Sequence, residues 1–314
     1  WGYDMSEREM NTTCVIAGGG PAGVVLGYLL ARAGVPVMVL EKHADFLRDF
    51  RGDTIHPSTL QVMQELGLLD RLLERPHQKV ARIGVHIGSA HLTVADFSHL
   101  PTPCPYVAFM PQWEFLNFLA TAGADLTTFQ LHMNTTVEGL LVEQSRVVGV
   151  RARDPQGTLT VRAALVVGAD GRGSLVRDKA GLAVRDLGAP IDVLWLRLSR
   201  RATDAAETLG RVNLGQVLIM IDRGDYWQCA FIIEKGALDS WKQKGLPAFR
   251  QTIAALQPSL ADRVDELRSW DDVKLLSVRL DRLEQWAKEG ILCIGDAAHA
   301  MSPVGGVGIN LAIQ

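Results

Sequence analysis

The chain has 314 residues, 47% of them hydrophobic and 21% charged, and its formal net charge is −3. A chain of this length exceeds a typical single hydrophobic core, so two domains are expected. The nearly balanced charge offers no basic field for nucleic acid. No apolar run reaches the ~18 residues that a membrane span requires. The composition therefore excludes nucleic-acid-binding and membrane-spanning proteins, and it is that of an ordinary soluble enzyme.

The cysteines and the start of the chain bear on the cellular compartment. The four cysteines are scattered without a Cys-x-x-Cys pair, and three lie in apolar, strand-like runs; they are Cys14, Cys104, Cys229 and Cys293. Buried, reduced thiols of this kind indicate the cytoplasm. Residues Trp1 to Asn11 are polar and lack a secretory pattern, so we interpret them as tag or leader sequence outside the predicted fold. We expect no metal site.

The first motif is a glycine-rich loop after the apolar run Cys14 to Ala17. Its glycines have the spacing of a dinucleotide-binding loop: the first permits a tight turn, the second lets the backbone approach a pyrophosphate, and the third lets a helix pack on its strand. They are Gly18, Gly20 and Gly23. A helix should follow over Val24 to Ala33 and end at Gly34, with its N-terminus facing the phosphates.

An acidic residue completes this unit. Val35 to Leu40 is predicted to form the second strand, and Glu41 stands at its end, close to the expected ~20 residues beyond the glycines. An acid at this position bonds a ribose hydroxyl. Strand, loop, helix, strand and acid together favour a nucleotide-binding unit over a purely structural glycine loop. They do not separate NAD from FAD.

Two later motifs separate them. Gly168-Ala169-Asp170-Gly171 follows the strand-like run Leu165 to Val167, and Gly295-Asp296-Ala297-Ala298-His299 follows Ile291 to Ile294. A second loop then leads into a helix; it contains Pro303, Gly305, Gly306, Gly308 and Asn310. A carboxylate at a strand end can accept hydrogen bonds from a sugar-like chain, and loop amides at a helix N-terminus stabilise an anion. A reducible flavin needs both.

In these motifs and their order, the chain resembles the single-component flavoprotein aromatic hydroxylases typified by p-hydroxybenzoate hydroxylase. The likeness covers nearly all of residues 12–314. It implies an α/β fold: a Rossmann-like FAD-binding domain with a discontinuous antiparallel β-sheet substrate domain. Where the sequence pattern changes, we place the FAD-binding domain at residues 12–79, 107–190 and 275–314, and the substrate domain at 80–106 and 191–274. Family members usually continue past the Asn310 helix, so a C-terminal region is expected beyond residue 314.

The resemblance also implies roles for individual residues. Glu41 would bind the adenosine ribose, Arg51 would lie against the phosphates, and Asp296 would hold the ribityl chain. Pro303 would sit beside the reacting ring. The full expected cofactor-binding set is Gly18, Gly20, Pro21, Ala22, Gly23, Glu41, Lys42, Arg51, Gln112, Val137, Asp170, Gly295, Asp296, Pro303, Gly305, Gly306, Gly308, Ile309 and Asn310. Arg177 would contact the nicotinamide donor.

The implied chemistry is aromatic hydroxylation. NADH or NADPH would pass hydride to non-covalent FAD, the reduced flavin would capture O2 as a C4a-hydroperoxide, and its distal oxygen would attack the ring of a small aromatic substrate. The sequence has no second dinucleotide-binding loop, so the donor would bind transiently. No side chain can be assigned as a catalytic base. The choice of donor and the oligomeric state, with a homodimer as one option, stay open.

The substrate pocket is where the chain departs from p-hydroxybenzoate hydroxylase. The corresponding strand reads Leu218-Ile219-Met220-Ile221 and carries no cation for a carboxylate. An unpaired carboxylate in an apolar pocket is unfavourable, so the predicted substrate is neutral, apolar and aromatic, or a polyketide-like ring system. The candidate pocket residues are Trp195, Met220, Tyr226, Trp227 and Gln228, each of which could instead belong to the core.

Three other functions remain open. A flavin-dependent halogenase shares this architecture, but its WxWxIP element is absent, because Trp195 is followed by Leu196 and Arg197. A flavin oxidase or reductase would pass electrons to O2 or a quinone without inserting oxygen. A non-catalytic protein could use FAD structurally and shield a reactive intermediate.

Overall fold

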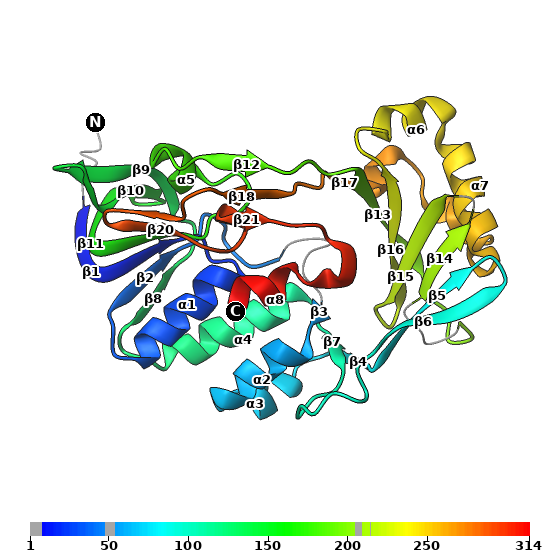
Figure 1. Cartoon of the computed structure of the whole chain (residues 1–314), viewed down its shortest axis with the longest axis horizontal. Helices are drawn as coiled ribbons and strands as arrows, with labels where there is room; N and C mark the ends of the chain where they lie inside the picture. Colours follow the sequence, from blue (N-terminus) through cyan, green and yellow to red (C-terminus); the bar gives the residue numbers. More distant parts are fainter. Residues whose placement is uncertain (1–7, 48–53, 205–208, 214) are drawn as a thin grey trace. The chain divides into compact units, whose positions relative to one another are not determined.

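Two units make up the chain in this computed structural model, which describes residues 8–47, 54–204, 209–213 and 215–314. Unit 1 comprises the residues up to 77 together with 109–188 and 279–314, and unit 2 comprises 78–108 and 189–278. Each unit is thus assembled from separate stretches of sequence, which the colours of Figure 1 make visible. Assigning FAD binding to unit 1 and substrate binding to unit 2 stays a prediction.

A largely parallel sheet organises unit 1, with the strand order β19-β20-β11-β1-β2-β8. Strand β1 lies between β11 and β2 and is parallel to both. An antiparallel extension, β9 and β10, is attached to β11. The bounds are β1 Arg8–Ala17, β2 Val37–Leu40, β8 Phe129–His132, β9 Thr136–Glu143, β10 Arg146–Asp154, β11 Gly157–Gly168, β19 Ala287–Lys288 and β20 Ile291–Cys293. The predicted α/β, Rossmann-like fold class is confirmed.

Strand β1 begins earlier than the sequence indicated. Arg8 to Asn11 pair in parallel with Leu159 to Arg162 of β11, and Met10 packs against the core of the sheet. Exposed and half-buried residues alternate here, so the segment has no continuous apolar run, and strand pairing alone reveals it. The interpretation of residues up to Asn11 as lying outside the fold was therefore wrong for 8–11.

Helices α1 (Pro21–Arg32) and α4 (Gln112–Ala124) lie side by side against this sheet (Figure 1). Two glycines allow this close packing. A Cβ on Gly27 would stand 2.7 Å from Val39 and 3.0 Å from the Phe129 ring, and one on Gly123 would stand 2.8 Å from the same ring. Pro21 starts α1, and Gly34 follows its end with a φ of +81°, as expected for helix start and stop signals.

The remaining elements of unit 1 are short. A small sheet has the order β12-β18-β21. The bounds are β3 Thr54–Ile55, α2 Pro57–Glu65, α3 Leu69–Leu73, α5 Leu175–Lys179, β12 Val184–Asp186, β18 Asp281–Leu283, η4 Gly295–Ala297, β21 His299–Ala300, η5 Val304–Gly306 and α8 Gly308–Ile313. Among the described residues, no helix is both long and apolar enough to cross a membrane.

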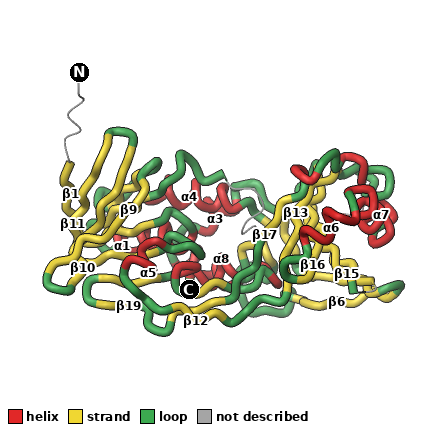
Figure 2. Tube along the Cα trace, turned by 90° about the horizontal axis from the view of Figure 1, so that it is seen from above, coloured by secondary structure: helices red, strands yellow, loops and turns green. Residues whose placement is uncertain are grey.

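Unit 2 is built on a seven-stranded sheet with the order β17-β13-β16-β15-β14-β5-β6. Its strands appear in yellow in Figure 2. The pairs are antiparallel, as expected, except for β14 and β5, which are parallel. The strands of this sheet are β5 Arg82–Ile87, β6 Ala90–Asp96, β13 Ile191–Ser199, β14 Leu209–Asn213, β15 Gln216–Asp222, β16 Tyr226–Glu234 and β17 Lys274–Leu276. Strands β4 Gln78–Val80 and β7 Val107–Phe109 lie outside it. The helical elements are α6 Leu238–Lys244, α7 Leu246–Leu256, η1 Pro258–Leu260, η2 Val264–Glu266 and η3 Trp270–Asp272.

An aromatic cluster forms the core of unit 2 between this sheet and helix α7. Phe249 is fully buried, and its ring centroid lies 5.3 Å from that of Phe231, 5.4 Å from Trp270 and 5.7 Å from Trp241. Two of these contacts are edge-to-face, a favoured geometry for aromatic rings. The same side of the sheet is lined by Leu194, Leu196, Leu198, Leu218, Met220, Trp227, Cys229, Phe231 and Ile233.

Phe249→Ala should lower the free energy of unfolding by about 3–5 kcal/mol, because it removes the central ring of this cluster and leaves a cavity. Urea denaturation followed by tryptophan fluorescence measures the change. Leu275→Ala is the control, since Leu275 is 44% exposed, and it should change stability by less than about 0.5 kcal/mol. Equal effects of the two substitutions would contradict the assignment of Phe249 to the core.

Candidate functional site

The three sequence motifs meet at one edge of the unit 1 sheet. Parallel strands β1, β2, β11 and β20 end at this edge, and backbone hydrogen bonds join the loops that follow them. The Gly18 amide donates to the Leu40 carbonyl at 2.8 Å, and the Ala169 amide donates to Ala17 at 2.8 Å. The Ile294 amide donates to Gly168 at 2.9 Å. Ligands of open α/β sheets bind outside these carboxyl ends.

Two glycines of the first loop are required by the protein itself. Gly18 has a φ of +107°, and a Cβ there would stand 2.3 Å from the Ala169 carbonyl oxygen. A Cβ on Gly23 would stand 2.0 Å from the Gly18 oxygen. Both positions exclude any side chain, because real Cβ atoms do not approach so closely. They hold the turn and bring helix α1 against its strand.

Gly20 is different, because no described atom of the protein lies close enough to exclude a side chain at this position. It is the N-cap of α1, its backbone is extended, and a Cβ would meet nothing within 4 Å among the described residues. Among the side chains that the structure describes, none caps the helix, and its first turn contains no acidic residue. Within the described part of the chain, the place of a Gly20 side chain beside the first-turn amides and the positive dipole end of α1 is therefore open, as an anion-binding helix terminus requires. A pyrophosphate would fit this place.

Glu41 is held rigidly at the end of β2. It is 8% exposed, and its Oε2 accepts a hydrogen bond from the Gly19 amide at 2.8 Å. Its Oε1 accepts from the His43 amide at 3.0 Å. These two bonds orient the carboxylate beside the glycine loop, at the position where an acid bonds a ribose hydroxyl in dinucleotide-binding folds.

Asp170 organises the second motif. Its Oδ1 accepts from the Ser174 hydroxyl, and its Oδ2 accepts from the Val176 amide at 3.1 Å. The Ser174 oxygen in turn accepts from the Arg177 amide at 3.0 Å and caps helix α5. The observed contacts of Asp170 are thus with the protein backbone and Ser174, and its predicted contact with the cofactor stays a prediction.

Arg177 is buried, with 5% exposure, and its guanidinium is bound by the protein. It donates to the Arg172 carbonyl at 3.0 Å, to Asp178 at 3.2 Å and to the Ala297 carbonyl at 3.4 Å. The last contact links the second motif to the third. These bonds give Arg177 a structural task within unit 1, and its contact with the nicotinamide donor stays a prediction.

The third motif packs directly on helix α1. Gly295 has a φ of +55°, and a Cβ there would stand 2.8 Å from the Ala22 methyl group. This contact brings the loop after β20 next to the start of α1, with Asp296 exposed at the same edge. The ring of His299 stacks on Trp286, with centroids 5.2 Å apart. Asp296 and the first-turn amides of α1 can therefore contact the same extended ligand.

The glycine loop before α8 is held by polar contacts. Gly305 and Gly306 both have positive φ, at +79° and +62°. Asn310 is 3% exposed, and its side chain makes hydrogen bonds to Thr54, His56, Thr59 and Gly306. Burial lowers the pKa of His56, and a hydrogen bond with the Gly305 backbone opposes that shift.

The other predicted cofactor residues are spread over unit 1. Pro21 and Ala22 begin α1, Lys42 follows Glu41 and is exposed, and Gln112 begins α4. Val137 lies in β9 and packs against the hydrophobic core. Pro303 precedes η5, while Gly308 and the buried Ile309 open α8. Arg51 lies outside the described residues.

The structure does not bring the predicted pocket residues of unit 2 together. Met220 and Trp227 are 1% and 2% exposed and point into the core beneath helix α7. Side chains alternate along a strand, so Trp195, Tyr226 and Gln228 lie on the opposite face of the sheet. Sequence reasoning missed Ile219, Ala230 and Ile232, which share that face and pack with Trp195. The period-two alternation of β15 and β16 could have identified them.

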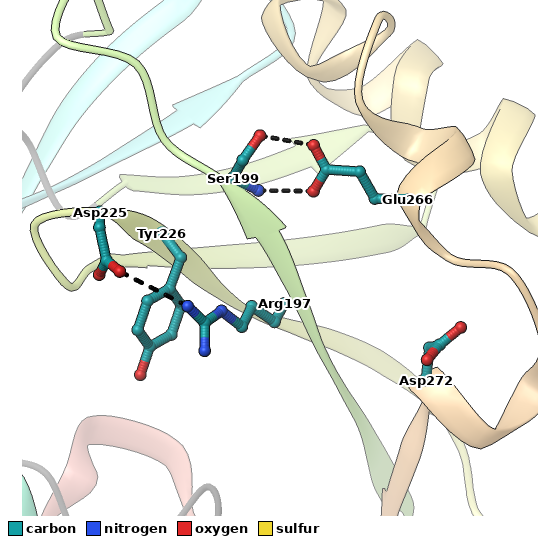
Figure 3. Close-up of a pocket in the computed structure, with 6 residues that line it drawn as sticks. All are labelled: Arg197, Ser199, Asp225, Tyr226, Glu266 and Asp272. Atoms are coloured by element: carbon teal, nitrogen blue, oxygen red, sulfur yellow. Dashed lines mark hydrogen bonds and ion pairs between the residues drawn. The ribbon is translucent and has the colours of Figure 1, made fainter.

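A polar cavity of about 300 Å³ also lies in unit 2 (Figure 3); it is lined by Arg197, Ser199, Asp225, Tyr226, Glu266 and Asp272. The Arg197 guanidinium lies 3.8 Å from the centre of the Tyr226 ring and 3.5 Å from an Asp225 oxygen. The Ser199 amide donates to Glu266 at 2.8 Å. The lining is thus mostly paired charges, unlike the apolar lining that an aromatic ligand prefers.

Comparison with known proteins agrees with this geometry. Residues 11–314 match a protein family described as FAD binding domain. The chain is 33% identical over 306 residues to the 6-methylpretetramide 4-monooxygenase of Streptomyces rimosus, covering 97% of this chain and 73% of that protein. It is 30% identical to the rifampicin monooxygenase of Streptomyces venezuelae, covering 96% of this chain and 61% of that protein.

A solved structure has the same fold. The chain resembles PqsL, a probable FAD-dependent monooxygenase from Pseudomonas aeruginosa, with a TM-score of 0.80 and 21% identity. The match covers 96% of this chain and 83% of PqsL. At this identity the likeness concerns the fold alone. The chain spans less than two thirds of the rifampicin monooxygenase and more of the other two proteins.

Gly20→Ala separates a ligand contact from a structural role. The added methyl group meets no described protein atom, so the melting temperature of the FAD-free protein should stay within about 2 °C of wild type. If a phosphate lies there, the FAD dissociation constant should rise at least about 10-fold, because the methyl group occupies its place. Fluorescence titration with FAD measures it. Unchanged FAD affinity would show that no ligand approaches Gly20.

Proposed function

The chain belongs to the family of FAD-dependent, aromatic-hydroxylase-type monooxygenases, and from this premise we propose that it uses NAD(P)H and O2 to hydroxylate a neutral, polycyclic aromatic compound. The observation that carries the proposal is the open N-terminus of α1 at Gly20, which stands at the same sheet edge as Glu41 and Asp296. A ligand that contains phosphate, ribose and ribityl groups would supply a partner for the α1 N-terminus, for Glu41 and for Asp296.

Each part of the site has a proposed task toward FAD. Glu41 accepts a hydrogen bond from the adenosine ribose, the first-turn amides of α1 hold the pyrophosphate, and Asp296 binds the ribityl hydroxyls. The loop from Gly305 to Gly308 places its amides at the flavin pyrimidine. Bound FAD supplies the redox chemistry, which moves a hydride from NAD(P)H and activates O2. The protein binds, orients and shields the reactants.

The reaction balances as hydroxylation of an aromatic carbon. NAD(P)H, a proton, O2 and the substrate Ar–H give NAD(P)⁺, water and Ar–OH. One oxygen atom forms the new C–O bond, and the other leaves as water with the hydride-derived electrons. The aromatic C–H proton is released when the ring regains aromaticity. No side chain of the chain is needed as a covalent partner in this scheme.

The names of the relatives support the substrate class. The two monooxygenases are named for 6-methylpretetramide and for rifampicin. The face of the unit 2 sheet opposite helix α7, called here the helix-free face, offers Trp195, Ile219 and Ile232 as an apolar surface. On the same face the buried Gln228 amide oxygen accepts a hydrogen bond from Arg223 at 2.9 Å. We propose that this face receives the substrate ring system.

Oxygen insertion is tested by product analysis with ¹⁸O2. The FAD-loaded protein, NADPH and an anthraquinone or naphthacene phenol should give a product heavier by one ¹⁸O atom, with about one NADPH consumed per product. Peroxide formation without a labelled product would identify an oxidase or reductase. A halogenated product in the presence of chloride would identify a halogenase. Absence of NADPH consumption and product would favour a non-catalytic role.

Two substitutions on neighbouring positions test which face binds the substrate. Ile219→Arg places a cation on the helix-free face, so kcat/KM should shift at least about 10-fold from a neutral phenol toward its carboxylated analogue. Met220→Arg instead buries a charge in the core under α7, and it should lower stability by several kcal/mol. Steady-state kinetics and urea denaturation measure the two effects.

The opposite behaviour of the two variants would contradict the assignment of substrate binding to the helix-free face. A folded, stable Met220→Arg protein with altered substrate preference would place the pocket on the α7 side. An Ile219→Arg protein with wild-type selectivity would remove the helix-free face from substrate binding.

We also infer a reducing, cytoplasmic environment. All four cysteines are buried and unpaired with one another. Burial raises the pKa of the Cys14 thiol to about 11 and that of Cys293 to about 12. Such thiols are unreactive and belong to the core.

A further inference from the structure

Asn310 joins two segments that are about 250 residues apart in the sequence. Its amide nitrogen donates to the Thr54 carbonyl at 2.9 Å and to the Gly306 carbonyl at 3.1 Å. Its amide oxygen accepts from the His56 backbone amide and the Thr59 hydroxyl, both at 2.8 Å. An amide side chain has two donor hydrogens and two acceptor lone pairs. All four positions are therefore filled by the protein.

Thr54 closes the same network from the other side. Its hydroxyl donates to the Gly306 carbonyl at 2.7 Å, so this carbonyl accepts from both Thr54 and Asn310. A Cβ on Gly306 would stand 2.2 Å from the Thr54 hydroxyl oxygen. Gly306 must then lack a side chain, and its φ of +62° is one that glycine adopts readily.

These bonds fix the orientation of one peptide plane. The Gly306 carbonyl points toward Thr54 and Asn310. In a trans peptide the following N–H points in the opposite direction, so the Val307 amide is directed away from them. The loop amides thereby take up an orientation that does not depend on a bound ligand, which is the pre-organisation that lowers the free-energy penalty of binding.

We propose that Asn310, Thr54 and Thr59 form a clamp that positions the glycine loop for the flavin, so that Asn310 acts through the loop backbone and not by a side-chain contact with the cofactor. The inference rests on the proposed function, because it assumes that FAD binds at this loop. Asn310 is accordingly a positioning residue. No role was predicted for Thr54 or Thr59 from the sequence, and both belong to the same clamp.

The test compares FAD binding in four purified variants, with Thr54→Val and Thr59→Val each removing one hydroxyl donor at nearly constant volume. Asn310→Asp keeps the shape of the side chain and replaces its donor group by an oxygen that faces two carbonyls. Thr128→Val is the matched control, because its hydroxyl donates to the Ala31 carbonyl at 2.9 Å near the end of α1. FAD titration, the visible spectrum of bound flavin, and melting temperatures with and without saturating FAD are measured.

Thr54→Val and Thr59→Val should each raise the FAD dissociation constant about 10-fold, and Asn310→Asp about 100-fold. The visible spectrum of the bound flavin should shift, and the gain in melting temperature from FAD should shrink. Thr128→Val should lower the melting temperature equally with and without FAD and leave the dissociation constant unchanged. If Asn310→Asp does not fold, the two threonine variants still show whether the clamp affects FAD binding.

Two outcomes overturn the clamp. Wild-type FAD affinity and spectrum in Thr54→Val and Thr59→Val, with only a lower melting temperature, would make the network purely structural. Loss of FAD affinity in Asn310→Asp alone would indicate direct contact between Asn310 and the flavin. Failure of the wild-type protein to bind FAD is a separate result, since it would refute the proposed function itself.

Discussion

The site depends on a close backbone contact between two loops at the carboxyl edge of the unit 1 sheet. The Cα of Gly18 lies so near the Ala169 carbonyl that no side chain fits between them. This contact sets the turn after β1, and the turn aims the N-terminus of α1. Gly23 and Gly295 then let α1 approach its strand and let the third motif approach α1. Without these contacts the open helix terminus and the two carboxylates would not share one edge.

Glycines in this site thus serve two different purposes. At positions 18, 23, 295 and 306, a methyl group would collide with protein atoms. At Gly20 it would meet none among the described residues, so the described part of the protein gives no reason for a glycine there. A ligand with negative charge supplies that reason, since the helix end beside it carries a positive partial charge and no acidic neighbour in its first turn.

The sequence predicted the parts of the fold that depend on local pattern. Strand ends marked by Gly18, Asp170 and Asp296 were predicted because apolar runs precede them, and the α/β class was implied by the family resemblance that these motifs carry. Arg8 to Asn11 were missed, because polar residues become a strand only through pairing with β11. The side of the sheet that Met220 faces was missed because the alternation along β15 was not applied. Asn310 and Arg177 each also bond to a distant segment, at His56 and Ala297 respectively, and no local pattern reveals such contacts.

Hydrogen–deuterium exchange of the chain with and without saturating FAD shows which backbone amides the cofactor covers. We expect FAD to slow amide exchange in three stretches of unit 1, residues 18–24, 295–298 and 305–310. Exchange in helix α7 of unit 2 should stay unchanged. Protection that is confined to unit 2, or that is absent from residues 18–24 and 295–298, would contradict the central claim that the cofactor lies across the carboxyl edge of the parallel sheet.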